Sequence, residues 1–485
     1  MHLPPQLASF LTWAFIIFLF RRDFREKPNV TGALWIPLIW FLIITTRAVS
    51  EWLSLFGVSM GGISLEEGSP LDASVYYSLI LAGIYVLNRR RVQLSEIIRN
   101  NQWLTIFFIY CFLAIFWSDF PFVAFKRWTK VIGHPIMVLI LFTEPDPMEA
   151  LTRLMQRSAY IIVPISILFI KYYPEWGRGF GEWSGQAMNC GITGGKNVLG
   201  CDCLILGFFF FWYLLQTWRT ERGKARRNEL LLIAATLVGI WWLLSGAQSS
   251  TSFMSLLLGV LTVALVGQRF VNKRRIGTYL VITVLAAAAA ESTFGIYDRV
   301  LVFLNRDPTL TERTVLWDAL LKVKINPVLG TGFESFWLGE RRQRLWNEQG
   351  WQPSEAHNGY LETYLNLGVV GLMLLIGLLF ATFWKTRREF LRNLEWGRFR
   401  LGFFVAILAY NWTESAFKSL HPVYFVFYII ALDYQWPRLA RIEQGPEEIR
   451  LEDEEIGAYC WVEGQGSDGF EDYNRVPRQP GSARN

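Results

Sequence analysis

The chain has 485 residues, of which 52% are hydrophobic, and it contains 22 Trp and 37 Phe. This composition is too apolar for a soluble protein of several globular domains. The formal net charge of +6 does not indicate nucleic-acid binding, because the basic residues cluster in alternate links between apolar stretches.

These apolar stretches recur along the chain to about residue 436. About 20 apolar residues in a helix cross a hydrocarbon core roughly 30 Å thick. The sequence therefore predicts an all-α, polytopic membrane protein with about 12–13 transmembrane helices. We count thirteen candidate spans, at residues 3–20, 34–50, 71–87, 102–118, 122–143, 158–173, 198–218, 229–246, 251–267, 277–294, 359–384, 399–415 and 419–436.

The links after odd-numbered spans hold the basic clusters, and the links after even-numbered spans are poor in them. Lys and Arg are retained on the cytoplasmic side of a membrane. We therefore expect the N-terminus outside and the C-terminus inside the cytoplasm. The clusters lie at residues 21–27, 89–91, 219–227, 269–275 and 385–400.

One long polar segment, residues 295–358, separates two apolar stretches. Loops longer than roughly 15 residues are usually functional or disordered, and this one is rich in aromatic residues and helical patterns. We interpret it as a folded extracytoplasmic (periplasmic) catalytic cap. It follows N-terminal transmembrane helices over residues 1–294 and precedes C-terminal ones over 359–436. The acidic and Gly/Ser-rich residues 437–485 predict a disordered cytoplasmic tail.

Ionisable side chains at membrane depth are functional candidates, although charge is also tolerated at the headgroup level. Many lie near the predicted outer helix ends, and together they predict a polar chamber beneath the cap. These residues are Arg47, Glu51, Lys126, Arg127, Lys196, Asp202, Glu291, Glu362, Glu414 and Lys418. The five cysteines show no disulfide framework, and a Cys-x-Cys helix such as 201–203 points its thiols apart, so no metal site is predicted.

Arg313 lies near the start of a predicted helix in the cap. Thr309 and Glu312 fit a capping box, so Arg313 is expected in the first turn, where helix N-termini attract anionic groups. A guanidinium can grip two oxygens of a phosphate. We expect Asn326-Pro327 to end the helix, and Gly330 and Gly332 to form a turn that approaches a ligand closely.

His357 lies at the other end of the cap. Ser354 follows Pro353 and is a plausible N-cap, which would place His357 in the first turn of the next helix. The positive end of the helix dipole disfavours an imidazolium ion. We therefore expect His357 to be neutral near pH 7 and able to accept a proton.

These residues resemble the O-antigen ligase/polymerase superfamily. The resemblance rests on Arg313, Trp317, Pro327, Gly330 and Gly332, then His357-Asn358-Gly359-Tyr360-Leu361 and Leu367-Gly368-Val369-Val370-Gly371, with Gly191–Gly200 upstream. It spans roughly residues 185–420. Ser249-Ser250-Thr251-Ser252 favours the branch that polymerises exopolysaccharide.

The resemblance implies a GT-C-like, inverting glycosyltransferase that works without a metal or other cofactor. It would act at the extracytoplasmic face of a bacterial cytoplasmic membrane, on undecaprenyl-diphosphate-linked oligosaccharides. Arg313 matches the family's diphosphate-binding arginine, and His357 matches the histidine proposed to activate the acceptor hydroxyl.

The sequence departs from many ligases in one respect: Gln248, Ser249 and Ser250 stand where those proteins have another essential arginine. We expect Lys196 and Arg127 to supply the second phosphate contact. Asn197, Glu355, Asn358 and Glu414 are expected to line the chamber for the substrate and acceptor.

Three functions remain open at this stage. The favoured one is polymerisation of lipid-linked repeat units, with a flippase and a chain-length regulator as possible partners. A ligase would instead transfer finished glycan to lipid A core or to a protein. A transporter or flippase would show internal repeats and broken helices at mid-membrane, and we find no convincing repeat.

Overall fold

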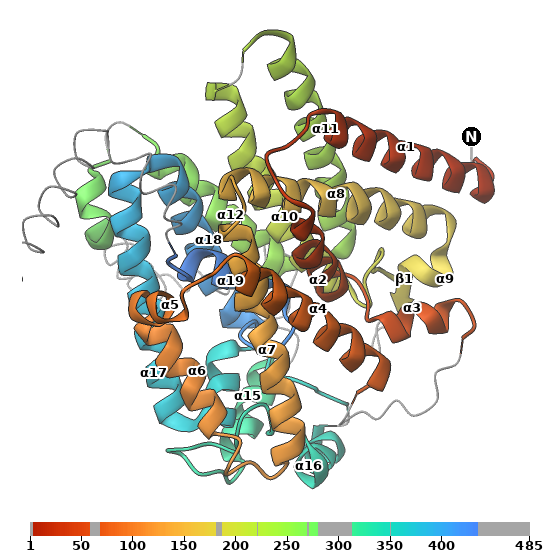
Figure 1. Cartoon of the computed structure of the whole chain (residues 1–485). Coiled ribbons are helices and arrows are strands. Elements are labelled where there is room, and N and C mark those ends of the chain that lie inside the picture. The colour runs from red at the N-terminus through yellow and green to blue at the C-terminus, as the bar shows by residue number, and fades with distance from the viewer. Residues whose placement is uncertain are drawn as a thin grey trace, which may run out of the picture. The chain divides into compact units, whose positions relative to one another are not determined.

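The computed structural model describes residues 3–58, 68–180, 187–220, 222–268, 271–279, 313–349 and 351–434, and these are mainly helical (Figure 1). The predicted tail 437–485, the capping box at Thr309–Glu312 and nearly all of the tenth predicted span lie outside the described residues. The elements are α1 (Pro5–Arg25), η1 (Gly32–Leu34), α2 (Trp35–Thr45), α3 (Val49–Leu55), α4 (Pro70–Arg89), α5 (Leu94–Asn100), α6 (Gln102–Leu113), α7 (Pro121–Phe142), α8 (Pro147–Tyr172), α9 (Pro174–Gly177), β1 (Arg178–Phe180), β2 (Ala187–Asn189), α10 (Lys196–Thr220), α11 (Gly223–Ala247), α12 (Ser250–Val266), η2 (Lys273–Arg275), α15 (Arg313–Lys322), α16 (Gly339–Gln349), α17 (Gly359–Arg392), α18 (Leu394–Thr413) and α19 (Pro422–Ala431).

The chain is an all-α, multi-pass membrane protein, and each predicted span within the described residues coincides with a helix. Among the described helices, α4, α8, α10, α11 and α17 are long and apolar enough to cross a membrane. The bent pair made by Gly32–Thr45 and α3, with a 63° angle, would be a sixth. The predicted number of 12–13 is higher because helices such as α6, α12 and α19 are apolar but short.

The core of the bundle is built around α10, most of whose apolar residues are buried. Phe208 of α10 stacks against Phe403 of α18 with ring centroids 4.1 Å apart, and Trp212 lies 4.9 Å from Phe399. A Cβ on Gly402 would come within 2.5 Å of the Val263 side chain of α12. Glycine therefore lets α12 and α18 approach closely, which is how helices commonly pack in membranes. This packing fixes the ends of α10 and α18, where two residues of the candidate site lie.

Helix α17 is broken at Gly368, which has φ 65° and ψ −167°. A segment of the cap, residues 327–332, pairs with the backbone on both sides of the break. Thr331 and Gly332 donate to the carbonyls of Leu365 and Asn366, and Val369 and Val370 donate to those of Pro327 and Val328. Non-helical backbone is tolerated in a membrane protein where other protein groups satisfy it. The Gly330 turn therefore packs against α17, and its approach to a ligand stays a prediction.

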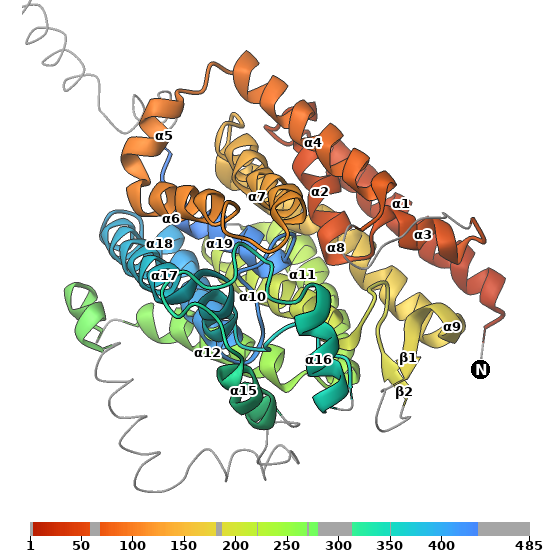
Figure 2. The same ribbon diagram turned by 90° about the horizontal axis from the view of Figure 1, so that it is seen from below.

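The described part of the cap belongs to the same compact unit as the membrane helices, Met1–Tyr434. Helices α15 and α16 lie at one end of this unit, at the bottom of Figure 1 and toward the viewer in Figure 2. Helix α15 ends at Lys322, four residues before the predicted end at Asn326. A small core joins the cap to α17 through Leu365; its members are Leu316, Leu320, Phe336, Trp337, Leu345, Ala356 and Leu365.

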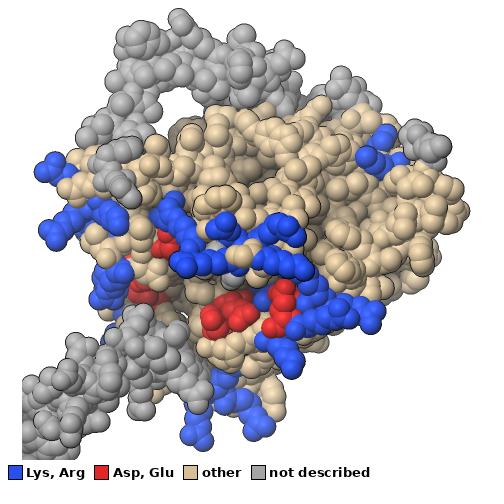
Figure 3. Space-filling model, turned by 90° about the horizontal axis from the view of Figure 1, so that it is seen from above, with Lys and Arg blue, Asp and Glu red and all other residues tan. Residues whose placement is uncertain are grey.

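Lys and Arg side chains gather on the face that looks upward in Figure 1, the side away from α15 and α16 (Figure 3). The alternating basic links predict that this side faces the cytoplasm. Cysteine labelling in cells should therefore find residue 340 outside and residues 90, 223, 390 and 460 inside. Labelling of residue 340 only after the cytoplasmic membrane is permeabilised would contradict the predicted orientation.

Candidate functional site

Glu414 is the centre of the candidate site. It lies directly after α18, where the negative end of the helix dipole disfavours a carboxylate, so it needs positive partners. Arg313, the first residue of α15, donates from Nη2 to Glu414 Oε1 at 2.6 Å and from Nη1 to the Thr413 carbonyl. Asn197 of α10 donates to the same Oε1 at 3.4 Å. Glu414 is only 6% exposed, so these partners hold a buried carboxylate in place.

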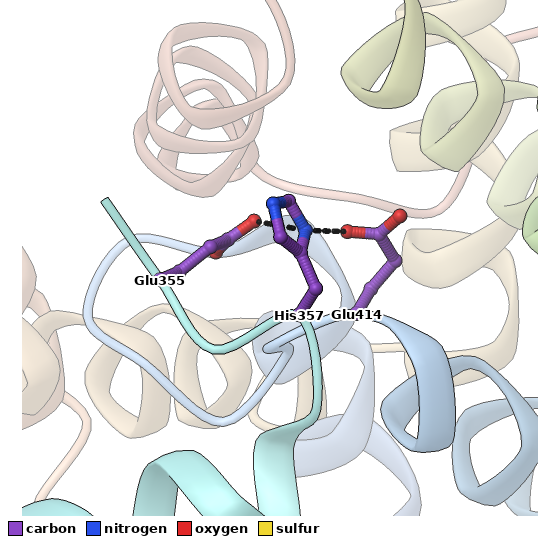
Figure 4. Close-up of side chains that lie close together, drawn as sticks. All are labelled: Glu355, His357 and Glu414. Atoms are coloured by element: carbon purple, nitrogen blue, oxygen red, sulfur yellow. Dashed lines mark hydrogen bonds and ion pairs between the residues drawn. The ribbon is translucent and has the colours of Figure 1, made fainter. Parts of the chain in front are cut away.

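The second oxygen of Glu414 faces His357. The distance from His357 Nδ1 to Glu414 Oε2 is 3.2 Å, and Nδ1 lies equally close to Glu355 Oε1. Figure 4 shows the imidazole between the two carboxylates, with dashed lines from both carboxylates to Nδ1. Because the carboxylates accept hydrogen bonds, they place a proton on Nδ1. In the neutral ring, Nε2 is then the nitrogen that can accept a proton.

Glu355 binds a second cation, Lys418, which lies in the loop between α18 and α19. Burial would raise the pKa of the Glu355 carboxyl, but Lys418 and then His357 outweigh burial and hold this pKa below its ordinary value. Burial would lower the pKa of the Lys418 ammonium, but Glu355 raises it instead. Both groups are therefore charged near neutral pH. The resulting charged row runs Arg313–Glu414–His357–Glu355–Lys418.

The loop that carries Glu355 and His357 is held on both sides of Ala356. Trp317 Nε1 donates to the Ala356 carbonyl at 2.7 Å, and the Ala356 N–H donates to Glu362 Oε2 at 2.8 Å. Glu362 also accepts from Trp337 Nε1 at 2.9 Å. His357 itself has φ 48°, a left-handed conformation that needs such support. The cap's indole groups thus fix the position of the histidine.

The predicted N-cap of α17 is wrong. Asn358, and not Ser354, caps this helix, because its Oδ1 accepts from the N–H groups of Tyr360 and Leu361. His357 therefore lies just before the helix and outside its first turn, and the dipole argument for its neutral form loses its basis. Asn358 is predicted to line the chamber, but its side-chain oxygen is used by the helix.

The Gly191–Gly200 motif positions Asn197 beside Glu414, a member of the row. Arg47 holds the motif by donating to the Thr193 carbonyl from Nε and Nη2, at 3.1 and 2.9 Å. Thr193 Oγ1 in turn donates toward the Gly195 carbonyl at 2.8 Å. This loop ends where α10 begins with Lys196 and Asn197. The motif is thus tied to the row through Asn197, and a phosphate contact from Lys196 stays a prediction.

Arg127 supports a neighbouring loop. Its guanidinium donates to the Glu334 carbonyl, and the Glu334 carboxylate accepts from the N–H and hydroxyl of Ser419. Ser419 follows Lys418, so Arg127 acts on the loop that carries this lysine. The predicted direct role of Arg127 in binding phosphate stays untested.

Glu355, His357 and Glu414 could also supply ligands to a metal ion, because their ligand atoms lie within 4.8 Å of one another. Each carboxylate already has a cationic side chain as its partner, Lys418 or Arg313. A metal would have to compete with these cations or share the carboxylates with them. Metal independence stays a prediction, which glycan synthesis in the presence of EDTA would test.

Comparison with known proteins agrees with the motifs. Residues 233–376 match a family model described as O-antigen ligase. The chain is also 28% identical over 307 residues to the exopolysaccharide production protein ExoQ of Rhizobium meliloti (strain 1021). That alignment covers 60% of this chain and 66% of the relative, just under two thirds of its length.

Both comparisons support a relationship to the O-antigen ligase/polymerase superfamily. The matched family region contains Arg313 and His357 but ends before Glu414 and Lys418. The matched region thus contains three members of the row, Arg313, Glu355 and His357, and the segment after α18 contributes the other two.

Sequence reasoning placed Arg313, His357, Glu355, Asn197 and Glu414 in one site, and the structure brings them together. It missed that Glu414 joins Arg313 to His357, and it placed Lys418 only among the many charged residues of the polar chamber. The only available signal was that both are charged residues near an outer helix end. That signal does not distinguish them from charged groups at the membrane surface.

Proposed function

We propose that the chain is a membrane glycosyltransferase that polymerises lipid-diphosphate-linked oligosaccharide repeats, such as undecaprenyl-diphosphate-linked units, into exopolysaccharide. The observation that carries the proposal is the sharing of Glu414 between Arg313, suited to a phosphate, and His357, suited to a hydroxyl proton. The similarity to an exopolysaccharide production protein supports a role in exopolysaccharide synthesis. The site would work at the extracytoplasmic face of the cytoplasmic membrane.

The proposed reaction is a single displacement with inversion. His357 Nε2 takes the proton from the acceptor hydroxyl while its oxygen attacks the anomeric carbon. The bond from that carbon to the diphosphate oxygen breaks, and the lipid diphosphate leaves with the electron pair. Arg313 stabilises the negative charge on the departing group. Glu414 holds both side chains so that the proton acceptor and the phosphate-binding group keep a fixed relative position.

A groove on the cap, lined by both charged and apolar side chains, supports a glycan substrate. It has a volume of about 680 Å³ and lies between α15, α16 and the turn at Asp119 and Phe120. Ligand sites usually have volumes of about 300–1,000 Å³. Charged side chains, including Lys322, Arg341 and Arg344, line it and can bind sugar hydroxyls. We propose that part of the oligosaccharide lies in this groove.

A ligase is the second candidate, because the matched family model is described as O-antigen ligase. The same row could transfer a finished glycan to an acceptor other than another repeat. The chemistry at the anomeric carbon would be unchanged, and only the acceptor would differ.

Purified protein and synthetic lipid-diphosphate oligosaccharide, with EDTA present, test the proposal directly. We expect glycans of increasing length on the lipid carrier. In cells that lack the protein, lipid-linked single repeats should accumulate. Accumulation of long lipid-linked chains would instead identify a ligase, and repeats that stay on the cytoplasmic face would identify a flippase.

Arg313→Lys keeps the positive charge but loses the planar guanidinium. We expect turnover or substrate affinity to fall about 10- to 100-fold, the size of one charge-assisted hydrogen bond. Arg219→Lys is the matched control, because Arg219 is an exposed arginine near the end of α10, outside the row and the groove, and is paired with Glu395. Equal glycan synthesis by both variants would contradict the role of Arg313.

A further inference from the structure

Lys418 lies at one end of the charged row and Arg313 lies at the other. Each of these cations binds one carboxylate of the row. The Lys418 ammonium binds Glu355, whose second oxygen faces His357 Nδ1. Arg313 binds Glu414, whose second oxygen faces the same Nδ1. The histidine is thus flanked by two carboxylates, and each carboxylate carries its own cation.

Lys418 is the most accessible member of the row. Its side chain is 39% exposed, compared with 16% for Arg313 and 6% for Glu414. An ammonium group has three hydrogen-bond donors, and the bond to Glu355 uses one of them. Lys418 can therefore bind an anionic ligand while its pairing with Glu355 is kept.

The loop that presents Lys418 is held in place. The next residue, Ser419, donates from both its N–H and its hydroxyl to the Glu334 carboxylate. Glu334 is itself tied to α7 through Arg127. A cation on an anchored loop loses less conformational freedom when it binds a ligand.

We propose that Lys418 is the second cation of an organic diphosphate site, with Arg313 binding one phosphate group and Lys418 the other. This inference rests on the proposed function and names a residue that neither the family region nor the sequence motifs include. The ligand atoms of Glu355, His357 and Glu414 lie within 4.8 Å of one another. Arg313 and Lys418 each bind a carboxylate that faces the same Nδ1, so the two cations lie at the two ends of one row around the imidazole. Lys418 would take the place of the arginine that Gln248, Ser249 and Ser250 do not supply.

Binding of inorganic pyrophosphate to the purified full-length protein, measured by calorimetry in lipid nanodiscs, tests this assignment. We expect Lys418→Ala to weaken pyrophosphate binding about 10- to 100-fold, and Lys418→Arg to keep most of it. Orthophosphate can reach only one of the two cations, so Lys418→Ala should weaken its binding by a smaller factor than it weakens pyrophosphate binding. Lys273→Ala is the control, because Lys273 is an exposed lysine of η2, outside the row and the groove, and this variant should bind pyrophosphate like the wild type.

Loss of Lys418 could also destabilise the fold by leaving Glu355 without its cation. The Lys418→Met/Glu355→Gln double variant therefore removes both charges. Its pyrophosphate affinity is compared with that of Glu355→Gln alone, and the difference gives the contribution of Lys418. Unchanged pyrophosphate affinity in the double variant relative to Glu355→Gln overturns the proposal. A loss seen in Lys196→Ala or Arg127→Ala, and not in the Lys418 variants, assigns the second cation to those residues.

The binding measurement involves no glycosyl transfer. Tight pyrophosphate binding that depends on Lys418, in a protein that lengthens no glycan, would reject the proposed function and keep the diphosphate site. Glycan synthesis that is unaffected in Lys418→Ala would keep the proposed function and reject the role of Lys418 in the diphosphate site.

Discussion

His357→Gln is expected to lower glycan lengthening by about 10²- to 10⁴-fold, the usual cost of losing a general base. Glutamine can keep a hydrogen bond to Glu414 or Glu355, but it cannot carry the proton from the acceptor hydroxyl. Lipid-linked repeats should still be made and delivered to the outer face, because these steps precede the transfer. Rates are measured with purified protein and synthetic lipid-diphosphate oligosaccharide.

His421 provides a matched control for this variant. Its Nδ1 caps α19 by accepting from the Val423 N–H at 3.2 Å. Asparagine is also a good N-cap, so His421→Asn should keep the fold and near-normal activity. If His357→Gln lengthens the glycan as fast as wild type, His357 is not the base.

Glu414→Gln should have an effect of similar size for a different reason. Arg313 can only donate hydrogen bonds, so the amide oxygen of the introduced glutamine must face it and the amide NH₂ must face His357. An NH₂ group opposite Nδ1 favours the tautomer with its proton on Nε2, which can no longer accept one. We therefore expect turnover to fall by up to about 10²- to 10⁴-fold. The loss is smaller if Glu355, which faces the same Nδ1, keeps the proton on that nitrogen.

Substrate affinity separates this explanation from simple misfolding. Glu414→Gln removes a negative charge next to Arg313, so binding of the lipid-diphosphate substrate should stay the same or become tighter while turnover falls. Glu26→Gln, at an exposed ion-paired glutamate directly after α1, should change neither quantity. A parallel loss of affinity and turnover in Glu414→Gln would show that Glu414 only supports the fold.

The sequence was sufficient to predict the helices and most members of the site. Apolar runs such as residues 198–218 and 229–246 specify helices locally, and α10 and α11 form there. The predicted N-cap residue of α17 was wrong because Ser354 and Asn358 are both good N-cap residues. Only the three-dimensional path of the loop selects Asn358. The break at Gly368 depends on backbone bonds from residues 327–332, which no local pattern reveals.

Contacts between distant residues were the least predictable part. Arg313 and Glu414 are 101 positions apart, and their pairing depends on how α15 packs beside the end of α18. Lys418 reaches the row only because the loop after α18 turns toward Glu355. Charge type and approximate membrane depth identify such residues as candidates, but they do not specify which charged residues pair.

The break in α17 also bears on how a substrate enters. Four backbone hydrogen bonds join residues 327–332 of the cap to α17. Swinging the cap away would leave these groups unpaired, at a cost of about 1–3 kcal/mol for each buried group. We therefore expect that the cap does not open as a hinged lid, and that a lipid carrier reaches the row sideways, from the bilayer between helices.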